Sequence, residues 1–243
     1  MEILREIIKG LPDLIWPPRC AACAKSLAPS DSDPLRELFC PVCASSVIWV
    51  TSPFCPRCGV PFEGVGEDHL CLDCLVDPPL FRKVGTVFEY GGAVAEALTK
   101  LKYASASELA RPFANLLAKL SLGLSSPDAV IPVPLHTKRL VKRGFNQSAL
   151  LGRPVARIQG ARFSPGLVRR ILDTAPQASC TRKARFENIK GAFAVTNPEK
   201  VRGKRILIVD DVITTGATIR EVSKVLMRSK AKSVEVIAVA RAS

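Results

Sequence analysis

Short apolar runs alternate with helical spacings along the chain from residue 81 onward. Such runs are typical of strands buried on both faces of a parallel sheet. They predict strands at Val84–Tyr90, Ala129–Val133, Gly166–Leu172, Ala192–Val195, Ile206–Val209 and Ser233–Ala240. Apolar residues three and four positions apart predict helices at Ala93–Lys102, Ser107–Leu120 and Ile219–Arg228, and another beginning near Asn146. This alternation predicts an α/β fold with a doubly wound parallel sheet.

Two segments interrupt this pattern. Pro154 falls inside the helix predicted from Asn146, and we expect it to shorten or kink that helix. Residues 174–188 show no clear period and contain several Lys and Arg side chains, so we expect a mobile basic loop there.

Residues 1–80 follow neither pattern. A short amphipathic helix is predicted over residues 1–18, and the proline-rich segment 19–77 has little periodicity. Eight of the nine cysteines lie in this part of the chain, in four CxxC pairs. The Pro78-Pro79 pair marks the end of the segment. The sequence therefore predicts two domains, 1–80 and 81–243.

The CxxC pairs predict zinc binding. Each pair places two thiolates on one tight turn, and two turns complete a tetrahedral site. Pairing of successive turns is the simplest arrangement, although the spacing also permits an interleaved one. A disulfide framework needs an oxidising compartment, and no signal-peptide pattern directs the chain to one. We expect two structural zinc sites, with the ligands Cys20, Cys23, Cys40, Cys43, Cys55, Cys58, Cys71 and Cys74.

The two parts of the chain also differ in charge. Residues 1–80 contain 6 Lys/Arg and 11 Asp/Glu, a net charge of −5, whereas residues 81–243 contain 29 and 11, a net charge of +18. A basic domain favours a polyanionic substrate or nucleic acid, and charge alone does not separate the two. No apolar run reaches the roughly 18 residues of a membrane span, so we expect a cytoplasmic protein without membrane insertion.

The stretch RILIVDDVITTGAT at 205–218 carries the strongest chemical signal. Asp210 and Asp211 follow an apolar run, and ligands of open α/β sheets bind beyond the carboxyl ends of strands. Gly216 permits positive φ or the close approach of a phosphate, and Thr218 is a candidate cap for the next helix. Beside the two acids we therefore expect an anion cradle formed by Thr214, Thr215, Gly216, Ala217 and Thr218.

A basic constellation follows the strand predicted at Ala129–Val133. It consists of four cations and a glycine that permits a tight turn, namely Lys138, Arg139, Lys142, Arg143 and Gly144. Its place at a strand end favours contact with a diphosphate leaving group, for which the candidates are Lys138, Arg139 and Arg143. The alternative is an ordinary solvated basic loop. His136, just before it, is expected to be a hydrogen-bonded loop residue rather than a general base.

The stretch VDDVITTGAT resembles the phosphoribosyl-pyrophosphate (PRPP) loop of type I phosphoribosyltransferases. The resemblance implies that Asp210 and Asp211 hold the ribose and that residues 214–218 wrap the 5-phosphate. Further motifs are similar to those of the ComF (ComFC) family of competence proteins: LKY at 101–103, VPLHTKRLVKRGFNQS at 133–148, Arg170, Thr174, Gln177 and FENIKGAF at 186–193.

The ComF resemblance implies a type I phosphoribosyltransferase-like parallel sheet with flanking helices, preceded by a small cysteine-rich double zinc-ribbon domain. It also implies PRPP binding, a magnesium requirement and a link to DNA uptake. One hypothesis is a phosphoribosyltransferase that acts on an acceptor the sequence does not identify. The other is a non-catalytic PRPP sensor, or an adaptor of the DNA-uptake machinery that binds single-stranded DNA. The small number of aromatic residues, 14 of 243, weakens a dedicated single-strand groove.

Overall fold

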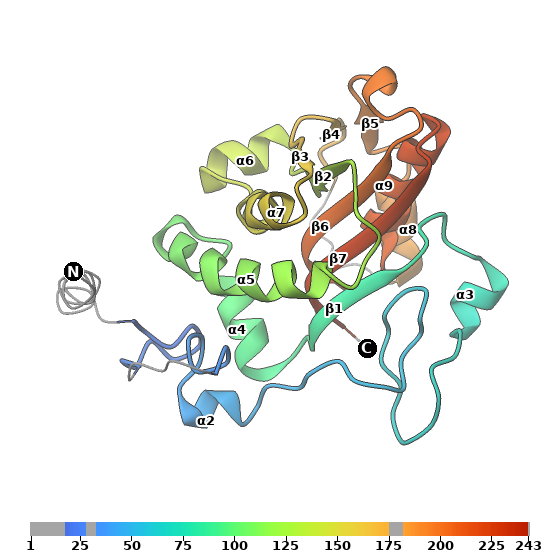
Figure 1. Cartoon of the computed structure of the whole chain (residues 1–243). Coiled ribbons are helices and arrows are strands. Elements are labelled where there is room, and N and C mark those ends of the chain that lie inside the picture. Colours follow the sequence, from blue (N-terminus) through green and yellow to red (C-terminus); the bar gives the residue numbers. More distant parts are fainter. Residues whose placement is uncertain (1–17, 28–32, 175–181, 243) are drawn as a thin grey trace.

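A five-stranded parallel sheet forms the centre of the protein (Figure 1). The computed structural model describes residues 18–27, 33–174 and 182–242, and the helix expected at the N-terminus lies outside them. Val236 pairs with Val84 of the neighbouring strand on one side and with Ile208 of the neighbouring strand on the other, and both pairings are parallel. The predicted parallel sheet is confirmed. Its strands in spatial order are β1 (Val84–Glu89), β7 (Ser233–Arg241), β6 (Arg205–Ile213), β2 (Ala129–Pro132) and β3 (Arg162–Phe163).

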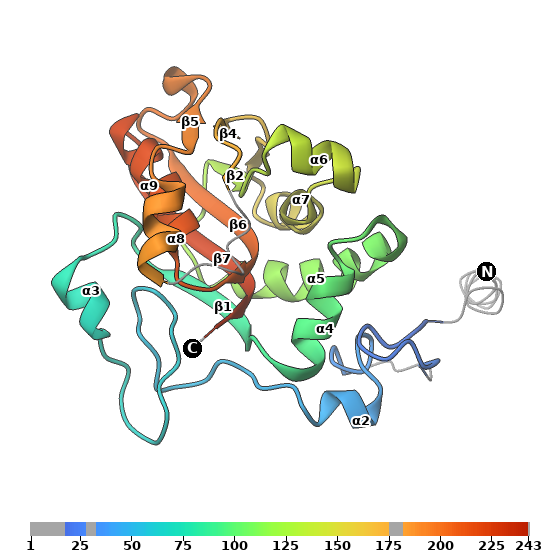
Figure 2. The ribbon, with the colours of Figure 1, turned by 180° about the vertical axis from the view of Figure 1, so that it is seen from behind.

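Helices cover both faces of the sheet, which explains the unbroken apolar runs of its strands. Leu207 and Val209 of β6 belong to one hydrophobic core, whereas Ile206 and Ile208 belong to a second. Figures 1 and 2 show the sheet between the two helical layers. The first layer contains α4 (Gly92–Lys100), α5 (Ala110–Ser121) and α7 (Gln147–Ile158). The second contains α9 (Ala217–Arg228), against which α8 (Arg182–Ile189) packs.

Two predicted strands form a separate two-stranded sheet. β4 (Val168–Arg170) and β5 (Phe193–Val195) pair in antiparallel fashion outside the main sheet, with Arg170 opposite Phe193. Strand β3 was not predicted, because two residues are too few to show a hydrophobic period. The remaining short elements are the 3₁₀ helices η1 (Ala104–Leu109) and η3 (Pro198–Lys200) and the helix α6 (Thr137–Arg143).

Several helices differ from their predictions. Helix α7 passes through Pro154 and continues to Ile158. A Cβ atom on Gly152 would lie 3.3 Å from the Phe163 ring and 3.5 Å from Val209, so the glycine lets α7 pack closely on the sheet. The single helix expected at 107–120 is η1 followed by α5. Within the expected loop at 174–188, α8 begins at Arg182, and residues 175–181 lie outside the described range.

The cysteine-rich segment packs on the sheet domain as two modules. The first module surrounds the cysteines at 20–43, and the second surrounds those at 55–74. The first contains α2 (Pro41–Ala44), and its Leu38 and Phe39 enter the core under α4 and α5, where the rings of Phe39 and Phe113 lie 6.5 Å apart. The second contains α3 (Leu72–Val76). The chain between them hydrogen-bonds along β1, with Val50 N donating to Val87 O, and so covers this edge of the sheet. The first module therefore shares its core with residues beyond position 80, and the boundary after residue 80 stays a prediction.

The packing of α7 yields a test of the first helical layer. Leu151 is fully buried, whereas its neighbour Leu150 is 36% exposed. We expect Leu151→Ala to lower the free energy of unfolding by about 2–5 kcal/mol, because it leaves a cavity in a packed core. Leu150→Ala is the matched control and is expected to cost less than about 1 kcal/mol. Urea unfolding of the zinc-replete protein measures both, and equal losses would contradict the buried face assigned to α7.

Candidate functional site

A cavity of about 510 Å³ lies at the carboxyl ends of β2 and β6. The last residue of β2, Pro132, pairs with Val209, and β6 continues beyond it. Asp210 and Asp211 are the next residues of β6, and both line the cavity. Strand β6, which was predicted to end at residue 209, thus continues through the two acids. At this point β2 has already ended, whereas β7 is still paired with β6.

Asp210 is buried in surroundings that disfavour its charge. Its Oδ1 atom accepts hydrogen bonds from Ser148 Oγ at 3.0 Å and from the backbone N of Asp211 at 2.9 Å. Burial, followed by repulsion from the Asp211 carboxylate, raises the pKa of Asp210 well above its ordinary value. A bound cation, or a ligand that donates hydroxyl groups, would relieve this arrangement.

Asp211 has a buried oxygen without a hydrogen bond. Its Oδ2 atom finds no hydrogen-bond partner in the described structure. The nearest cation is the Lys102 ammonium, whose Nζ lies 3.8 Å away. A buried oxygen of this kind is costly unless something pairs with it. The two acids therefore have spare capacity for Mg²⁺ or for the hydroxyls of a sugar.

The segment that carries the four cations is a helix, where we expected a loop. His136 Nδ1 accepts a hydrogen bond from Lys138 N at 3.4 Å and so caps the start of α6. Gly144 ends the helix with φ +79°, in the left-handed region that favours glycine. The expectation that His136 is a hydrogen-bonded residue is confirmed, and its position is a helix cap.

Two of the three candidate diphosphate residues line the cavity. Arg139 and Arg143 lie one turn apart on α6, and both contribute to the cavity wall. Lys138 instead forms an ion pair with Asp173, with 3.2 Å between Nζ and Oδ2, and its side chain is 77% exposed. Asp173 also lies 3.5 Å from His136 Nδ1. The fold therefore places the two arginines in the cavity wall, whereas Lys138 is not among the residues that line it.

The predicted anion cradle forms the turn from β6 to α9. Gly216 adopts φ +77°, as its residue type predicted, and it is also the N-cap of α9. The expectation that Thr218 caps the helix is wrong, because α9 begins at Ala217 and Thr218 is already inside it. Thr214 and Thr218 line the cavity. Ala217 N, at the start of α9, donates to Thr215 Oγ1 at 3.4 Å, and the helix N-terminus is electrostatically suited to an anion.

Sequence reasoning did not select three further residues of the cavity wall: Lys102, Gln147 and Arg170. Gln147 Oε1 accepts a hydrogen bond from Arg143 Nη1 at 3.1 Å. Arg170 is 9% exposed and donates to Thr174 Oγ1, and burial, followed by repulsion from Arg139, lowers the pKa of its guanidinium. The only sequence signal for these residues was their place in the motifs shared with the ComF family.

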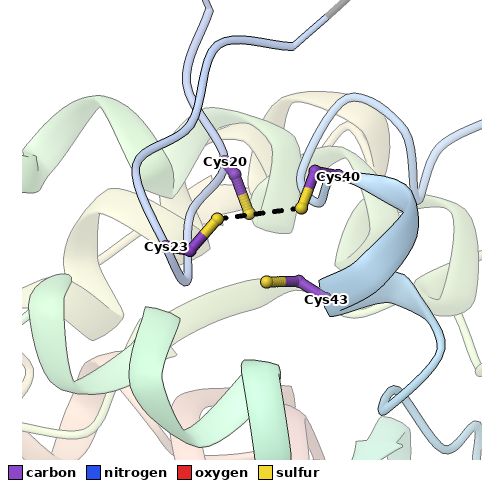
Figure 3. A group of neighbouring side chains, drawn as sticks. All are labelled: Cys20, Cys23, Cys40 and Cys43. Carbon is purple, nitrogen blue, oxygen red and sulfur yellow. Dashed lines mark hydrogen bonds between the residues drawn. The ribbon is translucent and has the colours of Figure 1, made fainter.

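The eight cysteines gather into two groups of four, each with its sulfur atoms within 4.8 Å of one another. Figure 3 shows the sulfurs of the first group directed toward a common centre. The sulfurs of Cys23 and Cys40 lie 3.7 Å apart, and those of Cys58 and Cys71 lie 3.6 Å apart. These distances are too long for disulfides and suit tetrahedral zinc, whose Zn–S bonds of about 2.3 Å place sulfurs about 3.8 Å apart. Each group joins two successive CxxC pairs, so the sequential arrangement is confirmed and both groups fit zinc.

Comparisons with known proteins agree with this architecture. Residues 11–75 match the family model of a double zinc ribbon domain, and residues 150–243 match that of a phosphoribosyl transferase domain. Among solved structures, a purine phosphoribosyltransferase from Pyrococcus horikoshii aligns with a TM-score of 0.34 and 18% identity, over 54% of this chain and 71% of that one. The two family models show that the protein combines a zinc-ribbon region with a phosphoribosyltransferase-like domain.

Two curated relatives extend the similarity over most of the chain. A DNA utilization protein YhgH from Salmonella typhi is 37% identical over 205 residues, which cover 82% of this chain and 88% of that protein. Competence protein F from Haemophilus influenzae is 31% identical over 197 residues, which cover 78% and 85%. The chain belongs to the ComF family of competence and DNA utilization proteins. Among the described residues, none of the helices is long and apolar enough to cross a membrane.

The cysteine groups predict the metal content. We expect two zinc ions per chain by mass spectrometry, because the groups share no ligand. Replacing Cys20 and Cys23 by Ser should remove one ion, and replacing Cys55 and Cys58 should remove the other. Cys180→Ser is the control, since it belongs to no CxxC pair. A variant that lost both ions through one double replacement would show that the two groups do not bind independently.

The raised pKa of Asp210 predicts an unusual pH dependence. The folded state holds this proton more tightly than the unfolded state, so the contribution of Asp210 to stability falls as pH rises above the unfolded pKa of about 3.9. Asp210→Asn should therefore raise Tm at pH 8 in Mg²⁺-free buffer and have little effect near pH 4. For a chain of this size, each kcal/mol gained corresponds to about 2–4 °C.

Asp128 provides a control of opposite sign. Its carboxylate accepts a hydrogen bond from the backbone N of Arg205 at 2.8 Å, and this bond, followed by that from the Arg205 side chain, lowers the pKa of Asp128. Its stabilising effect is present above the unfolded pKa and is lost as pH falls. Asp128→Asn should therefore lower Tm at pH 8. If both variants lowered Tm at pH 8, the result would contradict the prediction that the negative charge of Asp210 destabilises the folded protein.

Proposed function

We propose that the protein binds PRPP in the cavity at the ends of β2 and β6 and transfers its 5-phosphoribosyl group to an acceptor. Asp210 and Asp211 hold the ribose hydroxyls. The 5-phosphate lies in the cradle formed by Thr214, Thr215, Gly216, Ala217 and Thr218. Arg139 and Arg143, with Lys138 of the same helix, hold the diphosphate.

One observation carries this proposal: a single cavity combines two buried acids with four cations. Lys102, Arg139, Arg143 and Arg170 all line the cavity that contains the acids. A simple anion would meet the cations but be repelled by the acids, and a simple cation would meet the opposite difficulty. A ligand with hydroxyl groups between two phosphorylated ends satisfies both. PRPP has this distribution of groups.

The acids and cations would divide the chemical work. In the transfer, the bond between C1 and the diphosphate oxygen breaks, the diphosphate leaves with the electron pair, and an acceptor nucleophile bonds to C1. Positive charge develops on the sugar and negative charge on the leaving group. The carboxylates of Asp210 and Asp211 would face the first, and the guanidinium groups of Arg139 and Arg143 the second.

Magnesium fits this site. The buried Asp211 Oδ2 atom without a hydrogen bond, and the raised pKa of Asp210, are features that a nearby cation would relieve. Mg²⁺ would be held mainly by PRPP oxygens and water, beside the two carboxylates, and would offset negative charge on the diphosphate. The cations of α6 would share that task from the protein side.

The names of the relatives suggest a setting in DNA uptake or utilization. The net charge of +18 over residues 81–243 favours contact with polyanions in that setting. The alternative function is therefore an adaptor that binds single-stranded DNA. It predicts a binding constant for an oligonucleotide that falls steeply with salt, whereas an enzyme of small substrates needs no such binding.

The PRPP assignment is tested by calorimetry with Mg²⁺ present. The double variant Asp210→Asn/Asp211→Asn should lose PRPP affinity by at least about 100-fold, because two charged contacts are worth roughly 1.5–3 kcal/mol each. Wild-type protein that bound no PRPP at millimolar concentration would refute the proposal.

Helix α6 offers a matched pair for the diphosphate contact. Arg143 lines the cavity, whereas its neighbour Lys142 is exposed and does not. Arg143→Ala is expected to weaken PRPP binding about 10-fold or more, the equivalent of one charge-assisted contact. Lys142→Ala removes the same formal charge and should change the affinity by less than about threefold. Equal effects would indicate that the overall positive charge of α6 attracts PRPP, and that Arg143 makes no specific contact with the diphosphate.

A further inference from the structure

Helix α3 of the second module presents an apolar stripe to the outside of the molecule. Its Leu72, Leu75 and Val76 are spaced three and four positions apart and therefore share one face of the helix. Each of these side chains is at least 60% exposed, whereas large apolar side chains are more often buried. Cys74, on another side of the helix, is buried and belongs to the second cysteine group. We call the three exposed residues the α3 patch.

Polar contacts hold α3 in this orientation. Asp77, which ends the helix, accepts hydrogen bonds from Arg220 Nη1 at its backbone O, at 2.9 Å, and at its Oδ2 atom, at 3.0 Å. Arg241 Nε donates to Cys58 O at 3.2 Å, which attaches a CxxC turn of the same module to the end of β7. The α3 patch therefore belongs to a surface that is fixed to the sheet domain.

The surroundings of the α3 patch are acidic. Residues 55–80 contain five Asp or Glu side chains and one Arg, a net charge of −4. Two of the acids accompany the patch directly, since Asp73 lies within α3 and Asp77 ends it. An exposed apolar stripe among acids fits a partner surface that is both apolar and basic.

Helix α6 of the sheet domain offers such a surface. Its Arg139 and Arg143 line the cavity, and Val141, two positions from each of them, lies on the other side of the helix. Val141 is 78% exposed, and its neighbours Leu140 and Lys142 are exposed as well. We call Leu140, Val141 and Lys142 the α6 patch. Its helix thus has one side for the cavity and another that faces solvent.

The chain around the α6 patch is strongly basic. Residues 129–174 contain nine Lys or Arg side chains and one acid, a net charge of +8. The single acid is Asp173, which forms an ion pair with Lys138. The positive charge of this part of the chain therefore persists after that pair is counted. Both patches are apolar, and their surroundings carry opposite charge.

The two patches lie on opposite sides of the molecule. Figures 1 and 2 show α3 and α6 with the central sheet between them. One chain therefore cannot bring its own patches together, because both helices are attached to the same folded domain. A contact between them joins two copies, and it is heterologous, since each copy contributes a different surface.

We propose that the α3 patch of one copy docks on the α6 patch of a second copy, head to tail. The apolar side chains of the two patches pack together, and the acids of residues 55–80 face the cations around α6. The charge complementarity is the reason for assigning a second copy of this chain as the occupant. The contact leaves one unused patch at each end of a pair, so further copies can add in a row.

The test uses one variant of each patch. Leu75→Lys places a cation in the α3 patch, and Val141→Glu places a carboxylate in the α6 patch, so each would meet charges of its own sign in the docked pair. Leu122→Lys is the matched control, because Leu122 is also exposed and belongs to neither patch. Sedimentation equilibrium measures self-association of each zinc-replete full-length protein across the micromolar range, and mass spectrometry measures its zinc content. An equimolar mixture of the two patch variants is measured in the same way.

We expect the average mass of the wild-type protein and of Leu122→Lys to rise with concentration. Leu75→Lys and Val141→Glu should each retain zinc and raise the dissociation constant of self-association about 10-fold or more. Their mixture should associate about as tightly as wild type, because the first variant keeps an intact α6 patch and the second an intact α3 patch.

Three results would overturn the proposal. Wild-type protein that stays monomeric throughout the range would refute self-association. Patch variants that associate like wild type, or a control that is weakened as much as they are, would refute the two patches as the interface. A mixture that remains as weakly associated as the single variants would refute the head-to-tail pairing of α3 with α6.

Discussion

Two adjacent carboxylates at the end of β6 are the constraint on which the site depends. The strand stays paired with β7 as far as Ile213, but it loses β2 after Val209. Asp210 and Asp211 therefore lie in the middle of the sheet with one side open. Ser148, in the first turn of α7, donates to Asp210 and does not supply a positive charge. The free protein thus carries charge repulsion that a ligand can relieve, a common compromise between stability and function.

The remaining elements of the cavity bring positive charge to this pair from several directions. Lys102 follows α4, Arg139 and Arg143 belong to α6, and Arg170 ends β4. Only Lys102 comes within ion-pair distance of an acid, at 3.8 Å from Asp211. Arg139, Arg143 and Arg170 donate to uncharged groups, namely Thr174 O, Gln147 Oε1 and Thr174 Oγ1, so neither acid of the cavity neutralises their positive charge. This separation of charge within one cavity favours a ligand with distinct sugar and phosphate parts over a single ion.

The sequence predicted the features that depend on local chemistry or on burial of both faces. The strands around Ile208 and Val236 could be predicted because helices cover both faces of the sheet, so these strands are apolar throughout. The zinc ligands could be predicted because each CxxC pair lies on one tight turn of the chain. Helix α6 was missed because four cations among seven residues hide its period, and the role of Arg170 was missed because only tertiary folding brings it beside the acids. Pro154 was expected to shorten or kink α7, but the helix continues to Ile158, and Gly152 lets it pack closely on β6.

The two cysteine modules are attached to the sheet domain by different kinds of contact. The first inserts Leu38 and Phe39 into the core under α4 and α5. Its metal site therefore stabilises the fold by holding in place a module whose apolar side chains are buried in that core. The second is attached through the polar contacts of Arg220 and Arg241, both of which reach elements of the cradle. Disturbing the first module should act on the whole core, whereas disturbing the second should act first on the loop at Thr214. The second module is therefore the one whose position bears directly on the proposed chemistry.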